Sequence, residues 1–155
     1  MNPRTALPVA FALSALSLAA LAQNPPLAPA PSHWKLNVSA SDFGGAPQPT
    51  SITTNIYADT ESNLRWSRSV VTSKGTSTES WRGAYDGKLR PTTGAMHDKF
   101  SIRRDGTFHV EGGDGSTVDG TIIAADDLKS YTETATVKDK DGHEFHEKLI
   151  FDRVK

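Results

Sequence analysis

The sequence predicts an all-β domain in which a single antiparallel meander closes into a small up-and-down β-barrel of about eight to nine strands. Two observations support this fold class. From Trp34 onward, short runs rich in Thr, Val, Ile and aromatic residues carry an apolar residue at every second position. Turn signals containing glycine separate these runs, and no stretch keeps a helical period. A β-sandwich is the alternative, because two packed sheets also bury one face of each strand.

The alternating pattern places the strands in order along the chain. We expect strands near residues 33–38, 50–58, 63–72, 76–85, 99–104, 107–111, 117–124, 129–138 and 143–153. The turns between them are short and sequential, which favours an up-and-down barrel over the sandwich.

Loop length sets which residues face each other across a hairpin, so the loops test the predicted strands. The loop Lys140-Asp141-Gly142 pairs Val137 with Phe145 and, further along, places Glu133 opposite Leu149 and Glu147 opposite Ala135. In this register the apolar residues of both strands, among them Ala135, Val137, Phe145 and Leu149, gather on one face of the hairpin.

Two further hairpins unite their apolar residues in the same way. The loop Arg104-Asp105-Gly106 pairs Ile102 with Phe108. A two-residue loop Lys74-Gly75 pairs Trp66 with Gly83 and Leu64 with Tyr85.

The N-terminal segment indicates export. Residues 1–22 form a predicted cleaved signal peptide, in which Arg4 precedes an apolar run that ends in Ala20-Leu21-Ala22. This run is roughly 16 residues long, shorter than the ~20 that span a bilayer, so we expect no stable membrane insertion. Residues 23–32 form a Pro-rich tether, and residues 33–155 form a single β-barrel domain. We expect a soluble protein in the periplasm or outside the cell.

Composition narrows the possible partners. Removing Arg4 with the signal peptide changes the formal net charge from −1 to −2. A nucleic acid is therefore not an expected partner, because no basic surplus would hold its phosphates. The chain has no cysteine, so disulfides and an acylated N-terminal cysteine are not expected either. The oligomeric state stays open.

Three segments carry a family resemblance: Ser32-His33-Trp34-Lys35-Leu36-Asn37-Val38, the turn Tyr85-Asp86-Gly87-Lys88, and the closing Asp139-Lys140-Asp141-Gly142 hairpin with Leu149-Ile150-Phe151. Over residues 32–155 the chain resembles small secreted bacterial lipocalin-like proteins. The resemblance implies a calycin-type barrel whose first strand carries a tryptophan that plugs one end, and Trp34 takes that place. Ser32 stands where lipocalins have a glycine.

The predicted registers place both aromatic and charged side chains on the inward face. Trp66, Trp81, Tyr85 and Phe145 form the expected wall of a ligand site. Arg68, Glu133 and Glu147 are its candidate polar contacts, and Glu79 also points inward. Glu133 and Glu147 are diagonal neighbours, within reach of a shared cation or ligand amine. Alternatively, Arg68 or Arg82 neutralises them, or they lie in water at a barrel mouth.

These residues support an exported binding module that holds a small apolar or amphipathic molecule in a barrel cavity. The alternative is a structural or interaction domain of the cell envelope, with a filled core and no ligand. We expect no enzyme and no cofactor, because neither a G-x-S-x-G elbow nor another catalytic motif is present. We also expect no metal site: His143 and His146 are spaced wrongly for H-E-x-x-H and point to opposite faces of a strand.

Overall fold

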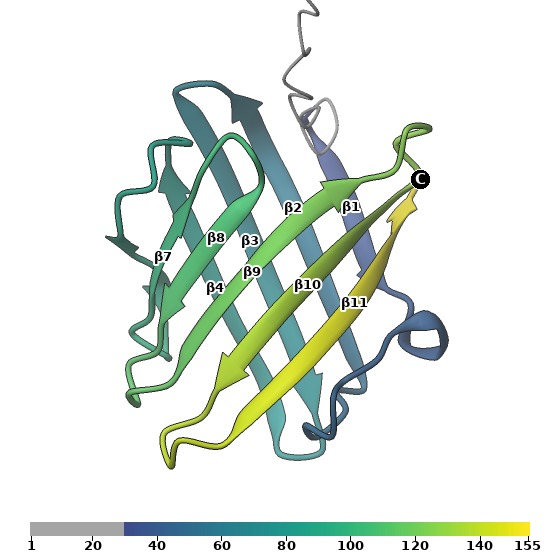
Figure 1. The fold of residues 1–155 in the computed structure, drawn as a ribbon. Coiled ribbons are helices and arrows are strands. Elements are labelled where there is room, and N and C mark those ends of the chain that lie inside the picture. Colours follow the sequence, from purple (N-terminus) through teal and green to yellow (C-terminus); the bar gives the residue numbers. More distant parts are fainter. Residues whose placement is uncertain (1–29) are drawn as a thin grey trace, which may run out of the picture.

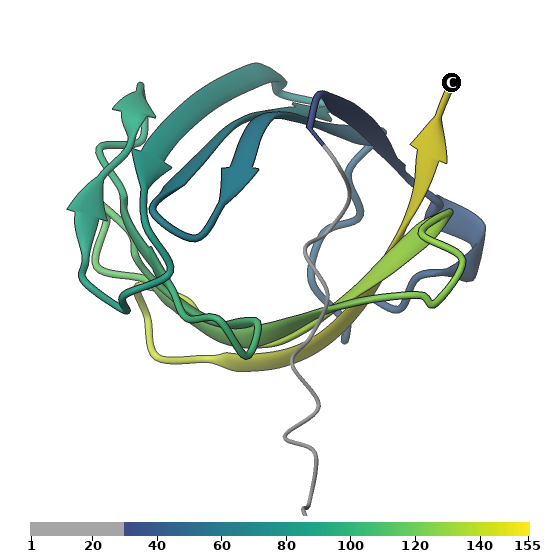
Figure 2. The same ribbon diagram turned by 90° about the horizontal axis from the view of Figure 1, so that it is seen from above.

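The computed structural model describes residues 30–155, which form one antiparallel sheet curled into a nearly closed barrel (Figures 1 and 2). The predicted signal peptide and residues 23–29 of the predicted tether lie outside the described residues. The first strand begins at Ser32, one residue earlier than expected.

Eleven strands make up the sheet. They are β1 (Ser32–Leu36), β2 (Ser51–Thr60), β3 (Asn63–Thr72), β4 (Gly75–Gly83), β5 (Arg90–Pro91), β6 (Thr93–Gly94), β7 (Lys99–Ile102), β8 (Thr107–Glu111), β9 (Thr117–Ala124), β10 (Ser130–Lys138) and β11 (Glu144–Val154). A single 3₁₀ turn, η1 (Val38–Ala40), follows β1. The nine predicted strands are all present, and the two-residue strands β5 and β6 are additional.

The strand order confirms the meander and excludes the sandwich for residues 30–155. All strands belong to one sheet, in the order β5-β7-β8-β9-β10-β11-β1-β2-β3-β4-β6. The first strand pairs with the last, with Leu36 opposite Phe151, so the chain closes the ring there (Figure 1).

The remaining seam of the barrel lies between β4 and β7. The segment 90–94 crosses it: Arg90 and Pro91 pair with β7, and Thr93 and Gly94 pair with β4. Only two residue pairs on each side hold this seam, whereas β10 and β11 share nine. Proline has no backbone N–H to donate to a neighbouring strand. It is tolerated in β5 because this edge strand forms only a short ladder.

Two of the three predicted hairpin registers are confirmed. Val137 lies opposite Phe145, and Ile102 lies opposite Phe108. The register predicted for the third hairpin is wrong by two residues: the turn is Ser73-Lys74, and Trp66 lies opposite Trp81 instead of Gly83.

Local hydrogen bonding at this turn explains the shift. The Thr72 hydroxyl accepts a hydrogen bond from the Lys74 N–H (3.2 Å) and donates one to the Gly75 carbonyl (3.3 Å). Gly75 itself has φ +132°, a conformation suited to glycine, and it is the first residue of β4. A two-residue slip keeps the parity of the strand, so the predicted inward faces are unchanged.

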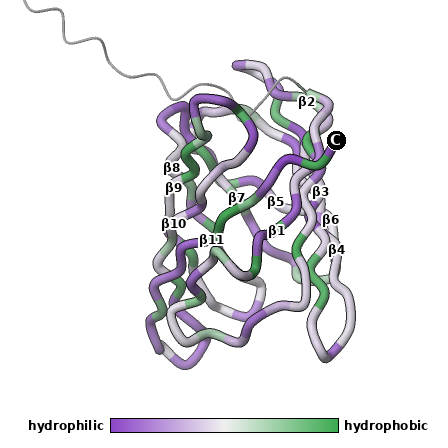
Figure 3. The backbone as a smooth tube through the Cα atoms, turned by 90° about the vertical axis from the view of Figure 1, so that its right-hand side faces the viewer, coloured by the Kyte–Doolittle hydropathy of each residue, from purple (hydrophilic) through white to green (hydrophobic). Residues whose placement is uncertain are grey.

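Aromatic side chains form two groups inside the barrel. Trp34, Tyr131 and Phe151 pack together, with ring centroids 4.9 Å and 4.6 Å apart. Trp34 also donates a hydrogen bond from Nε1 to Ser32 Oγ (3.0 Å). The second group consists of Trp66, Trp81, Phe100 and Phe108. Hydrophobic stretches recur along the strands, whereas the hairpin loops are mostly hydrophilic (Figure 3).

Candidate functional site

A cavity of about 270 Å³ lies inside the barrel. Apolar side chains from β2, β3 and β7 to β11 form most of its wall, because alternate residues of each strand point inward. Ligand pockets commonly span ~300–1,000 Å³, so this cavity is at the small end of that range. The core of this barrel is therefore not completely filled by its own side chains.

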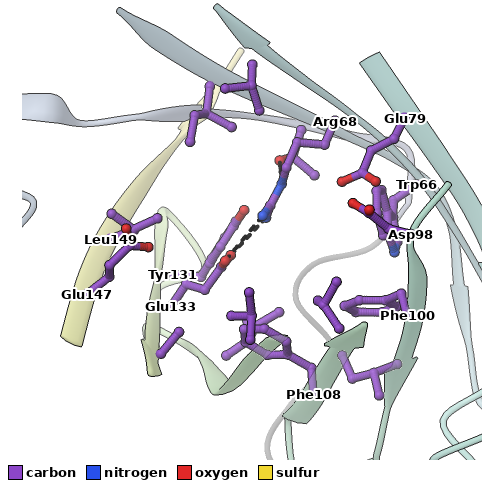
Figure 4. A pocket seen from close by; sticks show the side chains of 18 of the residues that line it. Trp66, Arg68, Glu79, Asp98, Phe100, Phe108, Tyr131, Glu133, Glu147 and Leu149 are labelled. Carbon is purple, nitrogen blue, oxygen red and sulfur yellow. Dashed lines mark hydrogen bonds and ion pairs between the residues drawn. The ribbon is translucent and has the colours of Figure 1, made fainter. Parts of the chain in front are cut away.

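A bidentate ion pair crosses one side of the cavity (Figure 4). Arg68 Nη1 and Nη2 donate to Glu133 Oε1 and Oε2, at 3.2 Å and 2.8 Å. Arg68 Nε donates to Thr54 Oγ1 at 3.2 Å, and the guanidinium lies 5.4 Å from the centroid of the Phe151 ring. Burial is the largest single influence on the pKa of Arg68 and would lower it, but the charge of Glu133, its hydrogen bonds and the nearby Tyr131 and Glu79 together outweigh burial and raise the pKa. The predicted neutralisation by arginine holds for Glu133.

Glu147 has no such partner. Its half-buried side chain lines the cavity, and no described residue forms an ion pair or hydrogen bond with its carboxylate. Burial raises the pKa of Glu147, and the negative charge of Glu133 raises it further. The two glutamates that the sequence placed together thus have different electrostatic surroundings.

A second acidic pair lines the cavity at the seam of the barrel. Glu79 on β4 lies opposite Arg68 in the ladder, and Figure 4 shows its carboxylate facing that of Asp98. Glu79 Oε2 is fully buried and has no hydrogen-bond partner among residues 30–155. The Gly113 N–H donates to Asp98 Oδ1 at 3.0 Å, which holds that carboxylate in place.

The surroundings of Glu79 disfavour its ionised form relative to water. Burial raises the pKa of Glu79, and the charges of Asp98 and Glu133 add to this rise. The charge of Arg68 and the nearby Thr92 hydroxyl offset this rise only in part. Parity on β4 predicts an inward Glu79, which is not among the predicted site residues. Asp98 carried no signal, since it precedes β7 in an irregular segment.

Four of the seven predicted site residues line the cavity: Trp66, Arg68, Glu133 and Glu147. Trp81, Tyr85 and Phe145 are not among its lining residues. The ring of Trp81 folds over Gly83 and packs against Phe100, with centroids 5.0 Å apart.

The other two side chains lie elsewhere. Tyr85 follows the end of β4 and donates from its hydroxyl to Asp59 Oδ1 at 2.8 Å. Burial raises the pKa of Tyr85, and the neighbouring Asp59 charge raises it further. Phe145 is half-buried near the end of β11, two residues before Glu147. The alternation of apolar residues identified the inward face of each strand. It did not indicate which inward residues fill the core and which line the cavity.

The chain matches no protein-family profile, and no curated protein or solved structure matches it. Function therefore has to be argued from the chemistry of the cavity. Within residues 30–155, no helix has the length and apolar character needed to cross a membrane.

A third candidate cluster lies in the β10–β11 turn. Carboxylate oxygens of Asp139 and Asp141 and a ring nitrogen of His143 lie within 4.8 Å of one another. Asp139 Oδ1 accepts hydrogen bonds from the backbone N–H groups of Asp141 (2.9 Å) and His143 (2.8 Å). This geometry is that of a capped turn, and we assign it no metal. The sequence spacing brings His143 together with His146 and gives no sign of this grouping.

A second pocket, of about 340 Å³, opens on the outer face of β7 to β9. Ser101, His109 and Asp119 lie side by side there on adjacent strands, and His109 Nδ1 is 2.7 Å from Asp119 Oδ1. Ser101 is buried, and no hydrogen bond joins its hydroxyl to the imidazole. Activation of a serine nucleophile needs that hydrogen bond, so we assign this row no reaction.

Proposed function

We propose that this protein is an exported binding module that holds a small apolar or amphipathic molecule in its barrel cavity. The observation that carries the proposal is the cavity itself, whose mostly apolar wall contains a few fixed charged groups. Apolar walls supply affinity and convergent polar groups orient a ligand, which is the usual composition of small-molecule sites.

The size of the cavity suggests the size of the ligand. An engineered apolar cavity of ~150 Å³ holds benzene. The present cavity, at about 270 Å³, is suited to a molecule with one or two rings or a short branched chain. Export is supported by the leader pattern of residues 1–22, where cleavage after Ala22 would leave Gln23 as the first residue. The resemblance to small secreted bacterial lipocalin-like proteins supports the same function.

Filling the cavity tests this proposal. Ala135 is buried and lines the cavity, so Ala135→Leu places three further carbon atoms inside it. We expect wild-type protein to bind the uncharged two-ring dye 1-naphthylamine, with a blue shift of the dye's fluorescence emission. The filled variant should bind this dye about tenfold or more weakly, because the added side chain occupies its volume.

The matched control is Ala40→Leu, the same substitution at an exposed position. Its dye affinity should equal that of the wild type, and melting temperatures should establish that both variants fold. Absence of dye binding by the wild type, or equal binding by Ala135→Leu, would instead favour a structural or interaction domain.

A further inference from the structure

The charges that line the cavity do not balance. Four carboxyl groups, those of Glu79, Asp98, Glu133 and Glu147, face a single guanidinium, that of Arg68. Both terminal nitrogens of Arg68 are already committed to Glu133. A cavity with three further acidic groups is electrostatically complementary to a cation.

The lysine next to Asp98 in the sequence does not neutralise the acidic groups of the cavity. Lys99 follows Asp98 directly, but its Nζ pairs with Glu111 Oε2 at 3.0 Å, and both side chains are about half exposed on the outer face. On the inner side, Glu79 Oε2 remains fully buried without a hydrogen-bond partner among the described residues. A buried carboxylate oxygen in this state is costly unless a donor reaches it.

The surroundings of Glu79 and Asp98 fit an organic cation. Trp66 and Phe100 line the same part of the cavity (Figure 4), and their ring centroids are 5.3 Å apart in an edge-to-face arrangement. Aromatic faces attract ammonium groups and also pack against apolar carbon. A bare metal ion would gain little from this apolar wall, because hard cations prefer many oxygen ligands.

If the cavity binds a ligand as proposed above, its chemical class follows from these contacts. We propose that the molecule is an amphipathic cation: its ammonium group lies between Glu79 and Asp98, and its apolar body packs against Trp66 and Phe100.

Proton linkage gives this site a characteristic pH dependence. The groups that face Glu79 are Arg68 on β3, Asp98 before β7, Glu133 on β10 and the Thr92 hydroxyl. A bound ammonium stabilises the ionised form of Glu79, so it lowers the raised pKa and releases a proton. Affinity for the cation should therefore increase as the pH rises from about 4.5 to 7.5.

Calorimetric titration of the protein with two isosteric probes tests the assignment. Cyclohexylmethylamine carries the ammonium group, and cyclohexylmethanol has the same body without charge. At pH 7.5 the wild type should bind the amine about tenfold or more tightly than the alcohol, since one charge-assisted hydrogen bond is worth about that ratio. Glu79→Gln should remove this preference and leave alcohol binding unchanged, and Asp98→Asn is a second variant should the first fail to fold.

The matched control is Glu111→Gln, which removes one carboxylate from the outer face and should keep the amine preference. Equal binding of amine and alcohol by the wild type would overturn the cationic assignment while dye binding still supported the cavity. A preference that survives in both Glu79→Gln and Asp98→Asn would refute this location. Failure of amine, alcohol and dye to bind would end both proposals.

Discussion

At the scale of single residues, the inward glutamates differ by their partners and not by their positions. Glu133 and Glu147 are both on inward faces, as alternation along β10 and β11 predicted. Glu133 meets Arg68, which lies 65 residues earlier in the chain. Glu147 lies opposite Ala135, and its pKa is raised by burial and by the charge of Glu133. No local pattern could have separated the two, because the partner comes from β3.

Substitution of Glu133 should therefore be costly. Glu133→Gln leaves the largely buried Arg68 guanidinium without its counter-charge, and we expect a loss of about 3 kcal/mol in unfolding free energy. This value is at the lower end for broken buried pairs, because 23% of the Arg68 side chain is exposed. Urea denaturation at pH 7.5 measures it. A loss no larger than that of the exposed substitution Glu144→Gln would show that the pair adds little to stability.

The opposite result is expected for Glu147. Its pKa is raised in the folded state, so the folded protein binds more protons than the unfolded chain between the two pKa values. The contribution of Glu147 to stability is thus greatest below the unfolded pKa of about 4.3 and declines as the pH rises through the folded pKa. Glu147→Gln should stabilise the protein at pH 7.5 and have little effect at pH 4. Urea midpoints of wild type and variant at the two pH values test this, and a variant less stable at pH 7.5 would contradict it.

At the scale of elements, hairpin loops with a clear glycine signal were easier to predict than the others. The loops ending in Gly106 and Gly142 have glycines at φ +83° and +88°, and both registers were predicted correctly. In the β3–β4 hairpin, Gly75 belongs to the strand, and the hydroxyl of Thr72 selects the turn. The short strands β5 and β6 are too brief to show alternation, so no sequence signal could have indicated them.

The corrected register changes which tryptophan matters most for stability. Trp81 is 3% exposed and packs over Gly83 and against Phe100, so Trp81→Ala should cost ~3–5 kcal/mol. Trp66→Ala should cost less, because Trp66 is only partly buried and borders the existing cavity. Lys148→Ala, at an exposed position on β11, should change stability by less than ~0.5 kcal/mol. Chemical denaturation of the three variants decides the order, and a larger loss at Trp66 would reverse our interpretation of the core.

At the scale of the whole molecule, the barrel closes firmly where its first and last strands, β1 and β11, pair and weakly at the β4–β7 seam. The β1–β11 ladder contains four residue pairs, whereas β4 and β6 share two. The acidic pair Glu79 and Asp98 lies at this seam, so local opening there would expose the proposed ammonium site. Short ladders with few buried contacts are the parts of a fold that open at the lowest free energy.

Gly94 permits this closure and provides a test. A Cβ at Gly94 would lie 2.6 Å from the Thr78 carbonyl oxygen and 3.0 Å from Glu79 Cα, so Gly94→Ala forces β6 away from β4. We expect a loss of ~1–3 kcal/mol and faster amide hydrogen exchange in residues 78–80. Exchange in the β10–β11 ladder should stay slow, and Ala95→Ser, which adds one atom at the exposed neighbouring position, should leave both regions unchanged. Uniform acceleration across the sheet would show that the seam does not open independently.

The sequence by itself determined nine of the eleven strands and the face on which their side chains lie. Both follow from the two-residue period of a strand, which is local and survives even the two-residue slip of β3 against β4. Only the tertiary structure decided that Arg68 pairs with Glu133 and that Asp98 faces Glu79. It also decided that a cavity of about 270 Å³ remains inside the barrel. These features depend on how far the sheet curls and on which strands face each other across the ring, and curvature and closure are properties of the whole sheet, not of any segment of it.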